Sequence, residues 1–187
     1  MTAGGPQQKP ASQTVWSLGL RLLHWTLALA MVTSFATREG AGKLHEWSGY
    51  VALAAATLRL VLGFAGGGRW RFSQFVRGAS ATLAYTRAVW QRREVRYLGH
   101  NPLGAWMALA LLADAIAAGL TGWLFTTDRF WGLQWLEELH SLLGHALIPL
   151  LLLHLAGVAF TSWRHRENLV AAMWHGRKPP AGPLDHE

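Results

Sequence analysis

Cysteine is absent from the 187-residue sequence. Without a thiolate, the chain cannot form a disulfide, ligate an iron–sulfur cluster or attach a c-type haem through a Cys-x-x-Cys-His motif. Charged residues are also scarce, at 14% of the sequence instead of the roughly 25% of a soluble domain. The composition therefore excludes thiol-based redox centres and does not fit a water-soluble globular protein.

Long apolar runs dominate what is present, and 51% of the residues are hydrophobic. A helix needs about 20 mostly apolar residues to cross the hydrocarbon core of a bilayer. Four segments approach that length: 18–36, 45–64, 103–126 and 139–163. No signal peptide is expected before the first of them, because it lacks a small-residue cleavage site. We predict an all-α membrane protein built as a four-transmembrane-helix bundle.

The remaining segments set the predicted domain boundaries. Residues 1–14 are polar and rich in Pro and Gly, which predicts a disordered cytoplasmic tail. Residues 15–179 form the four-helix transmembrane domain, and residues 180–187 form a short C-terminal cytoplasmic tail.

The net charge of +7 is distributed as expected for a membrane protein, not a nucleic-acid-binding one. Thirteen of the 17 Lys and Arg precede or open the first span, connect the second to the third, or follow the fourth. Three lie in the other connections, and Arg59 falls inside the second span. The positive-inside rule then places both termini in the cytoplasm.

The basic connection between the second and third spans also carries apolar residues at helical spacing. They are Phe72, Phe75, Val76, Ala79 and Leu83. This pattern predicts a cytoplasmic interfacial helix that lies in the headgroup layer and contacts anionic lipid. A specific protein-docking site is the alternative.

The fourth span contains three histidines, and ionisable side chains inside a membrane segment are a hypothesis about function by default. His140 and His154 are 14 residues apart, so they differ by only about 40° around a helix and about 21 Å along it. His145 lies about 140° from His140. His140 and His154 therefore share a face at two depths, whereas His145 lies on another face.

Each of these two histidines has a possible partner at its own depth. In a four-span topology His45 lies at the outer end of the second span, level with His140. His24 lies near the inner end of the first span, level with His154. Two facing imidazoles at each level are what a six-coordinate b-type haem iron requires, which predicts two haems b per chain. Hydrogen-bonded packing histidines are the plain alternative, and a zinc site would need a compact tetrahedral set.

Several motifs together resemble the prokaryotic cytochrome b561 family, which includes the b-type subunits of nickel–iron hydrogenases. They are "VWSLGLRLLHW", "LHEWSGYVAL" with "LRLVLGFAG", "GHNPLGAW", and "EELH" followed by "LHLAGVAFTSWRHRENLVAAMWHGRK". The resemblance covers residues 15–179. Its axial haem ligands fall on His24, His45, His140 and His154, and none falls on His145. Pro149 and Asp114 depart from the family pattern.

Four further polar residues are candidates for a role at the haems or near them. Arg59, and less strongly Arg21, are candidates for holding a haem propionate, with snorkelling toward the headgroups as the alternative for Arg59. His100 either serves a quinone pocket or anchors a loop. Asp114 is expected to be a neutral acid hydrogen-bonded to a neighbouring helix, ahead of a role with protons or quinone.

The resemblance implies a protein of the bacterial inner membrane that transfers electrons across it in a respiratory chain. Electrons would pass between the quinone pool and a periplasmic redox partner, such as a cytochrome c or a hydrogenase-type protein. One alternative is a stand-alone oxidoreductase acting on a small molecule such as superoxide at a haem edge. Another is a haem-free membrane anchor or metal transporter. The sequence leaves the partner and the direction of electron flow open.

Overall fold

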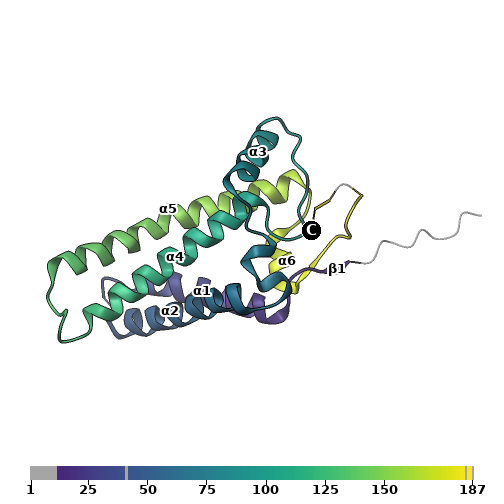
Figure 1. The fold of residues 1–187 in the computed structure, drawn as a ribbon. Helices are drawn as coiled ribbons and strands as arrows, with labels where there is room; N and C mark the ends of the chain where they lie inside the picture. The colour runs from purple at the N-terminus through teal and green to yellow at the C-terminus, as the bar shows by residue number, and fades with distance from the viewer. Residues whose placement is uncertain (1–11, 41, 184, 187) are drawn as a thin grey trace, which may run out of the picture.

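Four long helices form a bundle in the computed structural model, which describes residues 12–40, 42–183 and 185–186. Within these residues, four helices are long and apolar enough to cross a membrane. They are α1 (Leu18–Ala36), α2 (Gly42–Ala65), α4 (Pro102–Phe125) and α5 (Gln134–Arg164). They lie side by side along one axis (Figure 1). The predicted all-α transmembrane bundle is confirmed.

Local sequence signals explain where two of these helices begin. Ser17 caps α1, because its hydroxyl accepts a hydrogen bond from the backbone N–H of Leu20. Asn101 caps α4 in the same way through the N–H of Gly104, at 2.7 Å, and Pro102 occupies the first turn. Helix α5 continues through Pro149, which removes one helical hydrogen bond without ending the helix.

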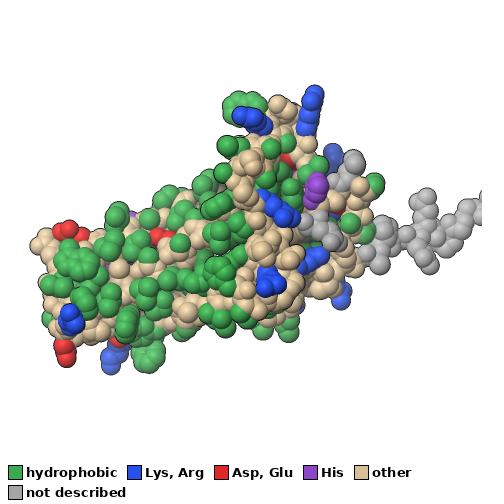
Figure 2. All heavy atoms as spheres, in the orientation of Figure 1, with side chains coloured by type: hydrophobic (Ala, Val, Ile, Leu, Met, Phe, Trp, Pro, Cys, Tyr) green, Lys and Arg blue, Asp and Glu red, His purple; other side chains and the backbone are tan. Residues whose placement is uncertain are grey.

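The sides of the bundle are apolar and exposed. Leu29, Leu58 and Leu152 are each at least half exposed, and Figure 2 shows hydrophobic side chains over the length of the bundle, with Lys and Arg gathered at the end that carries α3. A large exposed apolar surface in a chain with four such helices marks the region that contacts lipid.

The connection between α2 and α4 differs from the predicted single amphipathic helix. It contains two short 3-10 helices, η1 (Gly68–Trp70) and η2 (Phe72–Gln74), and then α3 (Ala79–Trp90). Phe72 and Phe75 pack into the core with Ala56 of α2 and Ala105 of α4. They therefore do not share a lipid-facing surface with Leu83, because the chain bends back onto the bundle before α3 begins. The position of α3 in the headgroup layer stays a prediction.

The two ends of the chain meet at the α3 end of the bundle. Strand β1 (Gln13–Thr14) pairs antiparallel with β2 (Arg177–Lys178), which follows the short helix α6 (Leu169–His175). The predicted disordered tail therefore ends too late, since Gln13 and Thr14 form a strand. Residues 1–11 of that tail lie outside the described residues.

Buried ion pairs hold this end together. The Glu167 carboxylate accepts hydrogen bonds from Lys178, at 3.2 Å, and from Arg96, at 2.8 Å, and Arg96 also pairs with Asp185. The side chains of Lys178 and Glu167 are each only 3% exposed. We call these four residues, together with the β1–β2 pair, the terminal clasp.

Candidate functional site

Two pairs of histidines face each other inside the bundle, and we call the pair at the α3 end the inner pair and the other the outer pair. The outer pair is His45 of α2 and His140 of α5, whose ring centres are 5.9 Å apart. The inner pair is His24 of α1 and His154 of α5, whose ring centres are 6.5 Å apart. The structure thus brings together the residues that their depths had matched.

Backbone carbonyls orient both rings of the outer pair. The Nδ1 atom of His45 lies 2.8 Å from the Ser34 carbonyl oxygen, and the Nδ1 atom of His140 lies 3.0 Å from that of Ala118. A carbonyl oxygen only accepts hydrogen bonds, so each Nδ1 carries the hydrogen and each neutral ring keeps its Nε2 lone pair free. Metal-ligating histidines are typically oriented in this way.

Close packing against α4 also fixes the His140 ring. Thr121 places its hydroxyl oxygen 3.2 Å from His140 Nδ1. A Cβ atom added at Gly122 would lie only 2.9 Å from His140 Cε1. Glycine at 122 therefore lets the imidazole lie directly on the α4 backbone.

Substitution of Gly122 by alanine is expected to displace the His140 ring by several tenths of an ångström. Overpacking of this kind costs about 1–3 kcal/mol, so any group held by His140 should be retained about tenfold more weakly. Gly42→Ala is the matched control, because a Cβ atom there meets nothing within 4 Å. The absorbance of the coloured group that remains bound, divided by the chain concentration after purification, measures this weaker retention. Equal values for Gly122→Ala and Gly42→Ala would contradict the role of Gly122.

Two hydrogen-bond donors that are unpaired within the described residues lie near the inner pair instead. Within the described residues, the His24 and His154 rings have no hydrogen-bond partner, and two buried donors on α1 are also unpaired, Arg21 Nε and Trp25 Nε1. Both lie within one turn of His24. Arg21 reaches the Trp174 carbonyl through Nη1, so its guanidinium is held in place beside this level. No role at this site was predicted for Trp25 from the sequence, although it is the last residue of the "VWSLGLRLLHW" motif.

Arg59 and His100 lie at the same end of the bundle. The Arg59 guanidinium donates to the Trp70 carbonyl at 3.0 Å and lies over the Phe72 ring, so it is half-buried against the connection between α2 and α4. His100 stacks on Phe75 with ring centres 4.6 Å apart. Burial, with the charge of Arg59 nearby, lowers the pKa of His100 to about 3, so this ring is neutral at physiological pH.

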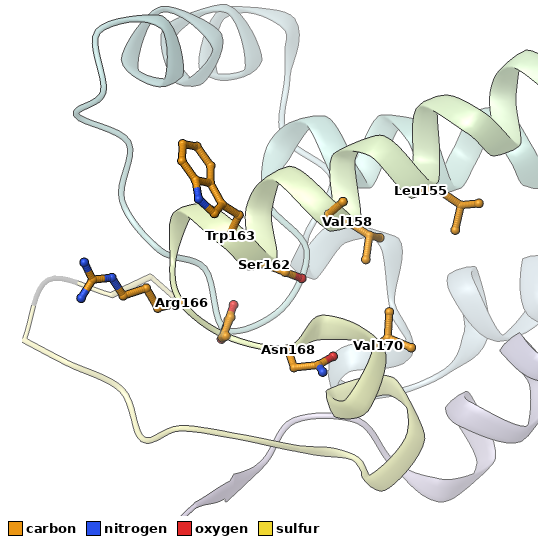
Figure 3. A pocket seen from close by; sticks show the side chains of 9 residues that line it. Leu155, Val158, Ser162, Trp163, Arg166, Asn168 and Val170 are labelled. Carbon is orange, nitrogen blue, oxygen red and sulfur yellow. The ribbon is translucent and has the colours of Figure 1, made fainter.

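The third histidine of α5 lies away from both pairs. His145 is exposed, and its Nδ1 atom lies 2.7 Å from the Ser141 carbonyl oxygen of its own helix. Near the inner pair, a surface groove of about 470 Å³ runs between the last turns of α5 and the first turn of α6. Figure 3 shows Val158 and Val170 facing each other across it, whereas Arg166 extends away.

The donor set fits a haem iron held between each pair. Two imidazoles on opposite sides of one metal, each bonded at about 2 Å, have ring centres about 6 Å apart. Both pairs approach this separation. The described residues contain no group of three or more His, Cys, Asp or Glu that could hold a metal ion, so nothing in them supports a tetrahedral zinc site. A metal at either pair would take its other ligands from outside these side chains, as a haem iron takes them from its porphyrin.

The profile of the prokaryotic cytochrome b561 family matches residues 15–176, nearly the whole chain. The chain belongs to this family. No curated protein sequence matches it. This cytochrome b561 is therefore a multi-pass bacterial membrane protein that binds b-type haem and functions in electron transfer. A haem-free anchor or metal transporter does not agree with that membership.

Proposed function

We propose that this cytochrome b561 carries electrons across the membrane through two bis-histidine haems b. The outer haem is held by His45 and His140, and the inner haem by His24 and His154. The observation that carries the proposal is the pairing of four histidines from three helices, with ring centres 5.9 and 6.5 Å apart. When bound, the haems supply the one-electron chemistry, and the chain supplies ligands, orientation and insulation.

Depth supports two centres in series. His140 and His154 lie on one continuous helix and differ by 14 residues, or about 21 Å along its axis. Two irons at these levels would divide the hydrocarbon core, about 30 Å thick, into short steps. With both axial positions of each iron filled by imidazole, electron transfer is favoured over binding of a small molecule at the iron.

Arg21 and Arg59 are proposed to hold the propionates of the inner haem. Arg59 lies 14 residues after His45 on α2, which places it about 21 Å deeper and level with the inner pair. Arg21 has a buried Nε donor that finds no partner among the described residues. A carboxylate satisfies such donors and compensates two cations that would otherwise be costly in the membrane.

The two ends of the electron path have different proposed partners. The excess of Lys and Arg at the α3 end favours a cytoplasmic location for that end and for both termini. The apolar groove between α5 and α6 supports a quinone or quinol site there, because Leu155 in its wall directly follows His154. The outer haem would then exchange electrons with a periplasmic partner, a cytochrome c or a hydrogenase-type redox protein, in a respiratory chain.

The number of haems per chain tests the proposal directly. We expect two haems b for each chain in protein purified from membranes, measured as the haemochrome against the chain concentration. Acid–acetone should extract all of the colour, because no cysteine is available to hold haem covalently. A ratio near one in fully loaded protein would contradict the proposal.

A further inference from the structure

Asp114 lies between the levels of the two histidine pairs. It belongs to α4 and is 92% buried, at 8% exposure. Thr121, which contacts the His140 ring, follows it by seven residues, or two helical turns, and so lies on the same face of α4. Asp114 is therefore about 10 Å from the outer pair along the bundle, and the inner pair is about 21 Å from the outer one. Its depth is close to midway between them.

No partner compensates this carboxyl group within the described residues. It forms no hydrogen bond and no ion pair there, so the hydrogen bond to a neighbouring helix expected from the sequence is not found. The titratable groups on the helices packed against α4 are Lys43, His45, Glu46, Tyr50 and Arg59 of α2, Tyr85 and Arg87 of α3, and Glu137, Glu138, His140, His145, His154 and Arg164 of α5.

None of these groups both faces Asp114 and shares its depth. The helix-end groups lie at the levels of the histidine pairs or beyond them. Tyr50 and His145 are the closest in depth, each five residues from its histidine pair. The Tyr50 hydroxyl lies 3.2 Å from Thr126 Oγ1 at the outer end of α4, and His145 is exposed and bound to the carbonyl of Ser141 on its own helix. The charge nearest to Asp114 in the haem-loaded protein is consequently that of the haems themselves.

Such a carboxyl group responds to the charge of the haems. A carboxylate in an apolar interior is unfavourable without a nearby positive charge. A ferric haem carries one more positive charge than a ferrous haem, and two charges at these distances interact appreciably in a medium of low permittivity. Oxidised haems therefore favour the Asp114 carboxylate, and reduced haems favour the protonated acid.

We propose that Asp114 takes up a proton when the haems are reduced and releases it when they are oxidised. The inference rests on the proposed pair of haem levels. One electron from a donor such as a quinol converts Fe(III) to Fe(II), and one proton from water converts the Asp114 carboxylate to the carboxylic acid. This one proton compensates the charge of one of the two electrons that full reduction of both haems brings into the bundle.

Redox titrations of both haems between pH 5 and 9 in the purified, fully loaded protein test this coupling. The mean reduction potential of the two haems should fall by up to about 30 mV per pH unit, because one proton accompanies two electrons. If one haem is reduced together with the proton uptake, its own reduction equilibrium should change by up to tenfold per pH unit, or about 59 mV. The dependence of the reduction potentials on pH should become markedly weaker in Asp114→Asn and persist in Asp114→Glu. Asp128→Asn, at an exposed acid in the loop before α5, is the matched control and should behave like the unchanged protein.

An infrared measurement provides a second test if Asp114→Asn loads haem poorly. Asp114→Glu is its comparison, because haem propionates also give carboxylic-acid bands and only a band from residue 114 should move in that variant. The reduced-minus-oxidised spectrum of the unchanged protein should gain a carboxylic-acid C=O band that shifts in D₂O. Absence of that band, potentials that do not depend on pH, or an equal dependence in Asp114→Asn would each overturn the proposal. Fewer than two haems per chain would instead contradict the proposed function, so the two failures are distinguishable.

Discussion

Replacement of His154 by alanine is expected to remove the inner haem and leave the outer haem in place. The substitution deletes one axial nitrogen and leaves a cavity beside His24, whose ring centre lies 6.5 Å away. His140→Ala should do the converse at the outer pair. Each variant should therefore lose one of two low-spin signals in electron paramagnetic resonance, and half of its haem. A redox titration would assign the surviving centre.

His145→Ala is the matched control on the same helix. Its ring is exposed and bonded to the carbonyl of Ser141, so its loss should leave both low-spin signals intact and change stability by no more than about 0.5 kcal/mol. If His145→Ala abolished a signal while His140→Ala kept both, the assignment of ligands on α5 would be wrong.

Removal of the Glu167 carboxylate is expected to open the terminal clasp. Glu167→Ala leaves Lys178, only 3% exposed at its side chain, without its carboxylate partner. Breaking a buried ion pair from one side costs about 3–5 kcal/mol. We therefore expect rapid trypsin cleavage after Arg177 and a lower thermal midpoint, with both haem signals measured in parallel.

The loss of stability in Glu167→Ala should depend on pH in a defined direction. Burial lowers the pKa of Lys178, and the neighbouring Glu167 opposes this effect. Without Glu167, the folded state binds a proton at Lys178 less readily than the unfolded state does. Stability of the variant should consequently recover as the pH rises toward 10.5, the ordinary Lys value.

Glu39→Ala provides the comparison for this prediction. Glu39 pairs with Arg38 at 2.9 Å but is 82% exposed, so its loss should cost less than about 1 kcal/mol. Equal protease sensitivity in Glu39→Ala and Glu167→Ala would show that burial of the Lys178 pair does not stabilise the clasp.

The depth of the histidines could be predicted from the sequence because a membrane span fixes both the direction and the rise of a helix. Residue numbers alone then place His45 level with His140, and His24 level with His154. The same regularity shows that His145 lies on another face of α5. For these residues, helical geometry and topology together determine the spatial pairs.

Features that depend on how helices rotate and pack against one another could not be predicted. The carbonyls of Ser34 and Ala118 carry no side-chain signal, and Gly122 is one of 20 glycines in the chain. Phe72 and Phe75 have helical spacing with Leu83, yet the chain bends between them and α3. Strand β1 has only two residues, too few for any periodicity.

The joining of the two ends of the chain has a consequence for biogenesis. Arg21 bonds to the Trp174 carbonyl 153 residues later, and the ring of Trp25, next to His24, packs on that of Trp174 at 5.9 Å. A ribosome releases the first two spans long before α6 and β2 exist. The contacts that close the protein around the inner pair therefore form only when translation is nearly finished. A haem bound there, as proposed, would have to enter before α6 docks or when the terminal clasp opens.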